Sequence, residues 1–312
     1  MNYRGDDVSA VITTAGNRAS ELLAALESVV HQSEGVGHIY VVWDLEKISA
    51  VMSEFIRTYP DVKHLLTGID HGGVSRARNF GIANCNTELI AILDDDDIWY
   101  PNKIAQQLVA LNRQDNDKVL CLSQSLLINE EYEVIQRTGK KRNGISILEP
   151  NKFFCKIPLK SSQVYLPTSS MIFSKNLVSQ VKFNQNLKTF EDIQFIFEAS
   201  HAGACFLINE PLVLTLVRKS EKTGLSHVGF DFDEWTNWVQ KNSLLAPKTK
   251  GNILIYFGTK RLLQANHFRK AFGWILISLK LKPDFHTFAV TTLIYLGNSI
   301  RAAVLCNMFR RT

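Results

Sequence analysis

Short apolar runs alternate with helical patterns in the first 112 residues, and this alternation limits the possible folds more than any other feature. Helices with apolar side chains three and four residues apart are expected between short buried strands. The strands are expected at 8–12, 39–43, 62–66 and 89–93, and the helices at 19–32, 49–59, 75–84 and 101–112. This order predicts an α/β fold with a doubly wound, mostly parallel sheet.

Ligands of such sheets bind beyond the carboxyl ends of the strands, so chemistry is sought there. Four consecutive acids, Asp94 to Asp97, directly follow the apolar run 89–93. Adjacent carboxylates repel one another, so a fold that gathers them needs a compensating cation. Carboxylate oxygens suit Mg²⁺ or Mn²⁺. An exposed acidic turn, or a cap for the helix after Pro101, is the alternative explanation.

Composition narrows the class of protein. The chain has 312 residues, 46% of them hydrophobic and 21% charged, which excludes disorder as the main state. Five scattered cysteines without a C-x-x-C pair disfavour a disulfide scaffold or a structural zinc site and favour a reducing compartment. The N-terminus has no apolar core of a signal peptide, and no apolar run is long enough to span a bilayer.

Charge is distributed unevenly along the chain. Residues 248–312 contain 11 Lys or Arg and one acid, a net charge of +10, whereas residues 1–247 carry −5. An apolar stripe at steps of three and four accompanies these basic residues from Phe285 to Met308. We expect a helical tail that binds an anionic membrane surface. Packing of the tail on its own domain, or on a second copy as a homodimer, is the alternative, and no nucleic-acid partner is expected because no binding motif accompanies the charge.

Residues 73–82 and 89–101 resemble the family-2 glycosyltransferases of the GT-A fold. Those proteins show a G-x-S-x-A-R-N-x-G-I stretch, a strand, and then a D-x-D-D-x-W-x-P element. Residues 8–18 resemble the first strand of the family and its P-T-Y-N-R turn, with Thr13 in place of the usual Pro and one residue inserted. Residues 41–44 resemble the V-V-D-D-G-S element, but Trp43 replaces its first Asp and the Gly-Ser is absent.

The resemblance implies a nucleotide-diphosphate sugar as donor, with a UDP-sugar expected, and Mn²⁺ or Mg²⁺ as cofactor. It implies a metal site at Asp94, Asp96 and Asp97. It also implies donor binding by Thr14, Asn17, Arg18, Asp44, Arg76, Asn79, Asp94 and Asp95. Arg76 and Arg78 are two residues apart on the predicted helix and cannot share a face. At most one of them is expected to reach phosphate, and the other to form an ion pair.

Residues 187–195 resemble the E-D element of the family, which implies Asp192 as general base and Glu191 as a substrate contact. A carboxylate there would take the proton from the acceptor hydroxyl as it attacks the anomeric carbon. The alternative is that both acids only begin a helix, where they favour its dipole. Arg218, Ser226 and His227 lie in a basic loop after the apolar run 211–217. This loop is interpreted as a flap over the diphosphate, or else as a solvated loop.

Two domains are expected: a catalytic domain at 1–247, with a nucleotide-sugar half (about 1–118) and an acceptor half (about 119–247), and the basic extension 248–312. Trp99 is expected to pack beneath the acidic loop. Residues 166–171 resemble the acceptor-side strand of the family and are expected to form a strand. The favoured function is an inverting, metal-dependent glycosyltransferase. It would act on a lipid-linked or cell-surface glycan, as a peripheral cytoplasmic protein at the inner face of the plasma membrane. Sugar transfer to polyprenyl phosphate and a catalytically inactive nucleotide-sugar-binding protein are the alternatives.

Overall fold

The computed structural model describes residues 1–138, 144–154, 166–217 and 232–254, together with residues 275, 276, 278, 280 and 281. The chain divides into two compact units. The first comprises Met1–Leu148 and Tyr165–Phe230, and the second comprises Glu149–Val164 and Asp231–Thr312. The basic extension was predicted to start at residue 248. The second unit instead includes all residues from Asp231 onward and the earlier segment Glu149–Val164.

The N-terminal half of the first unit follows the predicted alternation of strands and helices. After a short 3₁₀ helix (η1, Gly5–Asp7), its elements are β1 (Val8–Thr14), α1 (Ala19–Val30), β2 (His38–Trp43), α2 (Ala50–Thr58), β3 (Lys63–Leu66), α3 (Val74–Asn84), β4 (Leu89–Asp94), β5 (Asp97–Trp99) and α4 (Lys103–Leu111). Strands β3, β2, β1 and β4 lie side by side in that order, and each neighbouring pair is parallel. This confirms the predicted parallel sheet.

The second half adds the elements that broke the predicted rhythm. They are β6 (Val119–Ile128), β7 (Val134–Arg137), β8 (Ile145–Ile147), η3 (Thr168–Ser170), β9 (Ile172–Ser174), α6 (Lys175–Val178), α7 (Glu191–Ala202) and β10 (Ala204–Leu216). The sheet order is β3-β2-β1-β4-β9-β6-β10-β5. β9 lies antiparallel between β4 and β6, and β5 is antiparallel to β10. The prediction of a strand at 166–171 was wrong, since this segment forms the turn η3 and the strand starts at Ile172.

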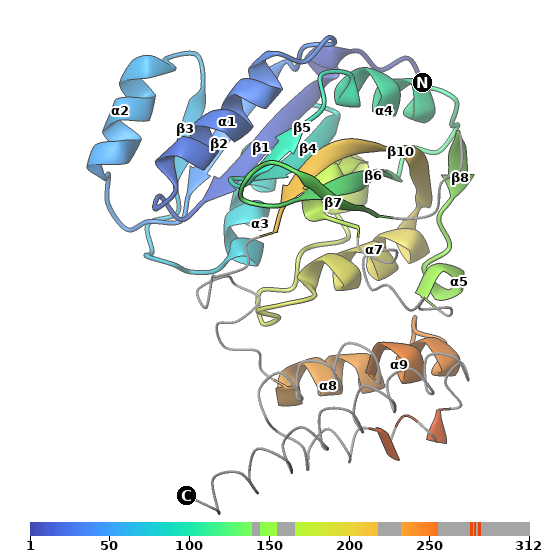
Figure 1. Ribbon diagram of the computed structural model, residues 1–312. Helices are drawn as coiled ribbons and strands as arrows, with labels where there is room; N and C mark the ends of the chain where they lie inside the picture. The colour runs from blue at the N-terminus through green and yellow to red at the C-terminus, as the bar shows by residue number, and fades with distance from the viewer. Residues whose placement is uncertain are drawn as a thin grey trace, which may run out of the picture. The chain divides into compact units, whose positions relative to one another are not determined.

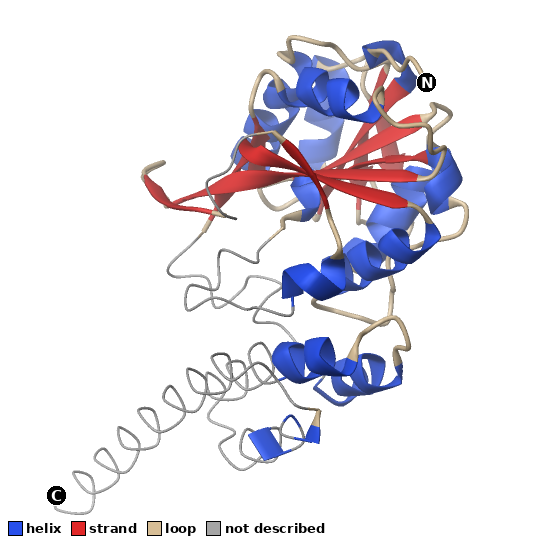
Figure 2. Ribbon diagram, turned by 90° about the vertical axis from the view of Figure 1, so that its right-hand side faces the viewer, coloured by secondary structure: helices blue, strands red, loops and turns tan. Residues whose placement is uncertain are grey.

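Helices cover both faces of the sheet (Figures 1 and 2). α1 and α4 lie on one face, and α3 and α7 on the other. β1 is buried along its whole length. α1 turns Leu22, Leu26 and Val29 into the core, as its apolar spacing predicted. Gly81 lets α3 approach the sheet closely, because a Cβ there would lie 2.6 Å from Val11 Cγ1 and 2.8 Å from a Val42 methyl.

The described part of the second unit contains α5 (Pro150–Phe154), α8 (Phe232–Lys241) and α9 (Pro247–Ile253). The side chain of Asn151 connects its segments, because its Nδ2 donates to the Leu244 carbonyl and its Oδ1 accepts from the Ala246 amide, each at 2.9 Å. In the part of the chain that the structure describes, no helix is both long and apolar enough to cross a membrane. Most of the predicted basic tail lies outside the described residues.

Candidate active site

The carboxyl ends of β1, β2 and β4 bring polar residues together at one edge of the sheet. Thr14 is paired with Trp43 at the end of β2, and Thr13 is paired with Asp94 at the end of β4. The parallel register therefore places the turn after β1 beside the acidic loop Asp94–Asp97. Ligands of doubly wound sheets bind at this kind of edge.

Two arginines neutralise the acidic loop. Arg18 Nη1 lies 2.6 Å from Asp96 Oδ2 and 3.4 Å from Asp95 Oδ1. Arg78 Nη2 lies 2.7 and 2.9 Å from the two carboxylate oxygens of Asp94. The chain itself thus supplies two of the compensating charges that four adjacent carboxylates require, one from the turn after β1 and one from α3.

Burial raises the pKa values of two acids in the loop. It raises the pKa of Asp95 to about 6, and the neighbouring Asp96 adds to this, although Thr14 donates a 2.6 Å hydrogen bond to Asp95 Oδ2. Burial and the charges of Asp96 and Asp94 raise the pKa of Asp97 well above its usual value. Asp97 lies in β5, paired with Thr215 of β10, and receives a hydrogen bond from the Ser169 hydroxyl.

A hard divalent cation fits part of this loop. The carboxylates of Asp94 and Asp96 are partly exposed, at 28% and 24% of their side-chain surfaces, and magnesium-type sites often use one or two carboxylates with phosphate oxygens completing the shell. Among the described residues, no three acidic, histidine or cysteine side chains converge on one point. Asp97 is buried in the sheet, so its role as a third ligand stays a prediction.

Asp44 lies just beyond β2, where its carboxylate caps a neighbouring turn. It accepts hydrogen bonds from the Thr67 hydroxyl at 3.1 Å and from the Gly73 amide at 2.9 Å. Arg76 approaches the same turn, with Nη2 3.3 Å from the Thr67 carbonyl oxygen. A Cβ on Gly72 would lie 2.7 Å from Arg76 Nη1, so the glycine makes room for this guanidinium. The structure therefore places two predicted donor-binding residues together.

Glu191 and Asp192 form the first turn of α7, as the helix-start interpretation also expected. The preceding Phe190 has a φ of 64°, which is uncommon for a large side chain. Asp192 Oδ1 accepts from the Ile193 amide at 2.8 Å. Burial raises the pKa of Asp192 to about 7, and the charge of Glu191 acts in the same direction. A carboxylate with this pKa is suited to accept a proton near neutral pH.

Several other predicted residues have different surroundings. Asn17 is exposed in the turn after β1. Asn79 binds the backbone of Phe183 through both ends of its amide, with Nδ2 2.7 Å from the carbonyl oxygen and Oδ1 3.1 Å from the amide nitrogen. The amide of Asn79 is therefore committed to a contact within the fold. Three predicted loop residues, Arg218, Ser226 and His227, lie outside the described residues.

A buried layer beneath the acidic loop was only partly predicted. Trp99 is 2% exposed, as predicted, and its Nε1 donates to the Ser169 carbonyl at 2.8 Å. Ser169 also accepts the Asp94 amide on its hydroxyl at 3.0 Å. The Lys103 ammonium lies 3.9 Å from the centroid of the Trp99 ring. Sequence reasoning placed Ser169 in a predicted acceptor-side strand, not beneath the acidic loop, and did not identify Lys103. The four-residue spacing of Lys103 and Gln107 on a predicted helix was the one available signal, because it places the two side chains on the same face.

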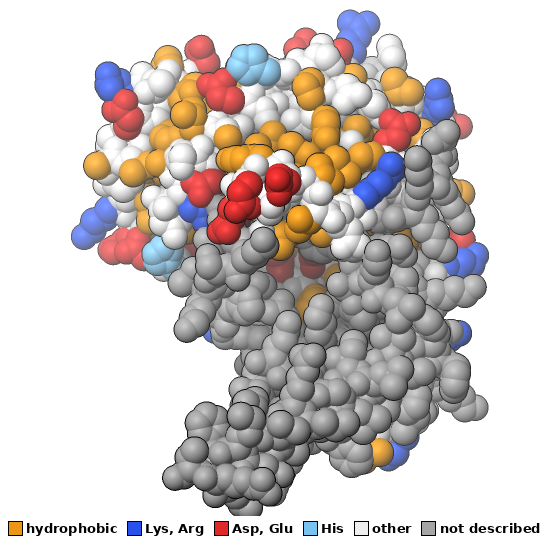
Figure 3. Space-filling view, viewed as in Figure 1, with side chains coloured by type: hydrophobic (Ala, Val, Ile, Leu, Met, Phe, Trp, Pro, Cys, Tyr) orange, Lys and Arg blue, Asp and Glu red, His pale blue; other side chains and the backbone are white. Residues whose placement is uncertain are grey.

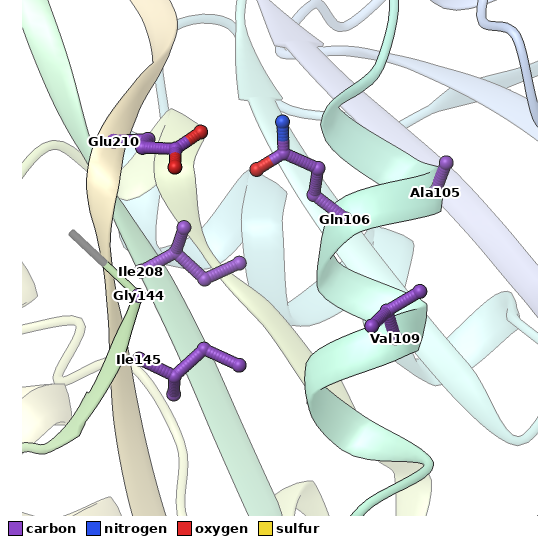
Figure 4. A pocket seen from close by; sticks show the side chains of 7 residues that line it. All are labelled: Ala105, Gln106, Val109, Gly144, Ile145, Ile208 and Glu210. Atoms are coloured by element: carbon purple, nitrogen blue, oxygen red, sulfur yellow. The ribbon is translucent and has the colours of Figure 1, made fainter.

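Two further surfaces contain none of the predicted site residues. The β6–β7 hairpin exposes acidic and apolar side chains together (Glu130, Glu131, Tyr132, Glu133, Val134 and Ile135). Figure 3 shows acidic and apolar groups adjacent on this face. A mainly apolar pocket of about 240 Å³ lies between α4 and the strands β8 and β10. Gln106 and Glu210 face each other across it (Figure 4).

The chain is similar to known proteins over much of its length. The family model described as "Glycosyl transferase family 2" matches residues 10–173. An uncharacterised glycosyltransferase of Rickettsia prowazekii is 24% identical over 306 residues, which cover 91% of this chain and 89% of that protein. The succinoglycan biosynthesis protein ExoW of Rhizobium meliloti is 25% identical over 205 residues, covering 62% of this chain and 61% of ExoW.

Solved structures show the same fold. The structure of residues 1–349 of S. aureus TarS in complex with UDP-GlcNAc has a TM-score of 0.61 at 14% identity, covering 82% of this chain and 72% of that one. The chain spans 43% of a longer TarS structure. Since the family model covers more than half of its residues, the chain belongs to glycosyltransferase family 2, and its mixed sheet has the GT-A fold.

Proposed function

We propose that the chain is an inverting, metal-dependent glycosyltransferase that moves a sugar from a nucleotide-diphosphate sugar to a hydroxyl group of a glycan. One observation supports this most directly. Arg78 binds both Asp94 of the acidic loop and Glu191, the neighbour of Asp192. One side chain therefore links a residue predicted to bind the donor diphosphate to the helix turn that contains the residue predicted to accept the proton.

Asp192 acts as the general base in this proposal. With a pKa of about 7, an ionised Asp192 takes the proton of the acceptor hydroxyl as its oxygen attacks the anomeric carbon. Attack on the face opposite the leaving group inverts the anomeric configuration. Asp94 and Asp96 would hold the cation, with Asp97 behind them. A bound Mg²⁺ or Mn²⁺ neutralises charge on the departing diphosphate.

The comparisons guide the choice of substrates. A TarS structure contains UDP-GlcNAc and another contains UDP, which supports a UDP-sugar as donor. ExoW is named for succinoglycan biosynthesis, which supports a lipid-linked or cell-surface polysaccharide as acceptor. A basic tail that binds anionic lipid would bring the enzyme to the inner face of the plasma membrane, where such acceptors are assembled.

The first experiment is a screen of UDP-, GDP- and dTDP-sugars for turnover with Mn²⁺, Mg²⁺ or excess chelator. We expect turnover of one donor class that stops in chelator and with Asp96→Ala. Asp192→Asn should lower kcat at least ~10²-fold while nucleotide binding is retained. Full activity in chelator would refute the metal requirement, and a product with retained anomeric configuration would refute inversion.

The same screen separates the alternatives. Transfer to a polyprenyl phosphate, with no transfer to glycan hydroxyls, would identify the second enzyme class. Nucleotide-sugar binding without turnover of any donor would identify a protein that has lost catalysis. Vesicle binding tests the tail, because each Lys or Arg near an anionic surface contributes about 1 kcal/mol and salt screens the attraction. If the full-length protein does not bind anionic vesicles at low salt, residues 248–312 are instead a packing or dimerisation element.

A further inference from the structure

Arg78 joins two segments that are far apart in the sequence. Its side chain is 4% exposed, and it lies on α3. Nη2 binds both oxygens of Asp94, and Nη1 donates to Glu191 Oε1 at 2.8 Å. Burial opposes the charge of the guanidinium, but the charges of Asp94 and Glu191 outweigh burial and raise the pKa of Arg78. The arginine is therefore a fixed cation, and its planar fork suits two carboxylates better than a lysine would.

Aromatic contacts and backbone hydrogen bonds around Arg78 also connect α3 to α7. The guanidinium lies 5.3 Å from the centroid of the Phe183 ring, which stacks on Phe195 of α7 at 4.3 Å and 9°. The neighbouring Asn79 binds the backbone of Phe183. Gln194 of α7 in turn accepts from the Asn184 amide at 3.0 Å. Two adjacent residues of α3 thus anchor the beginning of α7. Arg78 binds Glu191, and Asn79 holds the backbone of Phe183, whose ring stacks on Phe195.

The ion pair of Glu191 acts together with other contacts at the first turn of α7. Phe190, just before it, has a left-handed backbone conformation, which costs free energy and persists where the surroundings impose it. The helix has no side-chain cap at its N-terminus. Gln194, at the end of this turn, binds the backbone of Lys182 and of Asn184. The ion pair of Glu191 with Arg78 links the turn to α3 and, through Arg78, to Asp94, and Asp192 follows in the next position.

We propose that Arg78 is a positioning residue that couples the two halves of the site: by binding Asp94 and Glu191 together, it holds the first turn of α7, and with it Asp192, in a fixed place beside the acidic loop. This inference rests on the proposed function for its catalytic meaning. Its structural part stands without that function. Arg78 itself need not touch the substrate, because it acts through the two carboxylates that it binds.

The structural part is tested by hydrogen–deuterium exchange of the full-length protein without substrate. Glu191→Gln keeps the side-chain size but removes the charge, and Arg78→Met removes the cation. Both should increase exchange of the amides at 190–195 at least severalfold, and Arg78→Met should also increase exchange at 94–97. The matched control is Arg57→Met, which removes an arginine from the exposed pair with Glu54 and should change neither segment. Unchanged exchange at 190–195 in Glu191→Gln would overturn the proposal, even if Arg78→Met fails to fold.

Kinetics test the coupling. Glu191→Gln should lower kcat at least tenfold with little change in the KM of the donor, whereas Arg78→Met should lower kcat and raise the KM, because it also releases Asp94. The double variant should have the kcat of Arg78→Met alone, since both substitutions break the same ion pair, that of Arg78 with Glu191. Fully additive effects would overturn the coupling. If the wild-type protein turns over no donor, the proposed function fails, and the exchange experiment still decides whether Arg78 holds α7.

Discussion

Removal of a buried lysine beneath the acidic loop is predicted to increase the free energy of unfolding, whereas most core substitutions decrease it. Lys103 is completely buried, and its Nζ has two neighbours on the described part of the chain: Gln107 Oε1 at 2.7 Å and the face of the Trp99 ring. No described carboxylate lies within ion-pair distance of it. Burial lowers the pKa of Lys103 from 10.5 to about 7, and Cys121 nearby opposes this only in part. Replacing this lysine by methionine should stabilise the fold at acidic pH.

The expected gain can be worked from the structure. With a pKa of about 7 in the folded state and 10.5 in the unfolded chain, the charged lysine costs the folded state ~5 kcal/mol. Lys103→Met removes this cost. It also leaves Gln107 Oε1 without its donor, which costs ~1 kcal/mol. The net gain in the free energy of unfolding at pH 6 is therefore ~4 kcal/mol.

The gain should become smaller at higher pH. Between pH 7 and 10.5 the unfolded chain holds the proton of Lys103 and the folded chain releases it, so the wild-type protein gains stability as pH rises. At pH 8.5 this gain amounts to ~2 kcal/mol, since each pH unit above 7 contributes about 1.4 kcal/mol. The variant has no lysine there and gains nothing from this source. At pH 8.5 the variant should therefore be only ~2 kcal/mol more stable than the wild-type protein.

Urea unfolding of both proteins at pH 6 and pH 8.5 measures the difference. Coincident transitions by tryptophan fluorescence and circular dichroism are needed before one free energy is assigned. Lys63→Met is the matched control, because the Lys63 ammonium lies over the Tyr40 ring at 4.9 Å but the residue is exposed, so its effect should not depend on pH. A Lys103→Met protein that is less stable than wild type at pH 6, or a difference that does not change with pH, would refute the reasoning.

Three other predictions concern sites elsewhere in the first unit. The Trp43 indole donates to His64 Nδ1 at 3.1 Å, and burial lowers the pKa of His64, so the folded state should lose stability as pH falls below about 6.5; an NMR titration with a His64 pKa above that value would contradict this. A Cβ at Gly203 would collide with the Lys118 carbonyl oxygen, so Gly203→Ala should cost ~3 kcal/mol, measured as a lower Tm. Because the pKa of Asp192 is about 7 and the base must be ionised, kcat should rise between pH 6 and 8, and a flat profile would remove Asp192 as base.

The sequence predicted the half of the sheet in which each strand is followed by its own helix. Apolar runs and helical spacing are local signals, and the observed bounds of β1, β2 and β4 differ from the predicted ones by at most two residues. The strands β5 and β9 gave no such signal, because each has three residues. Their positions depend on pairing with β10 and with β4 and β6, which lie far away in the chain. Short antiparallel insertions of this kind are set by tertiary contacts.

The candidate site shows the same division. The acidic loop and the acids of α7 were recognisable as motifs, but their partners were not. Arg78 is 16 residues from Asp94 and 113 residues from Glu191. At these separations, local sequence patterns indicate neither pairing. What local spacing did indicate is that Arg76 and Arg78 point to different faces of α3. Arg76 contacts Thr67, and Arg78 forms the buried ion pairs.

Trp43 illustrates how a departure from a family motif can be understood only in three dimensions. The residue stands where the motif has its first Asp, yet it belongs to β2 and is fully buried. Its ring packs edge-on against Phe55 at 5.7 Å. Because side chains alternate along a strand and the strand ends here, the following Asp44 is the first residue free to turn toward the edge, where it binds Thr67 and Gly73. The substitution therefore adds to the core and leaves one carboxylate, that of Asp44, at this strand end.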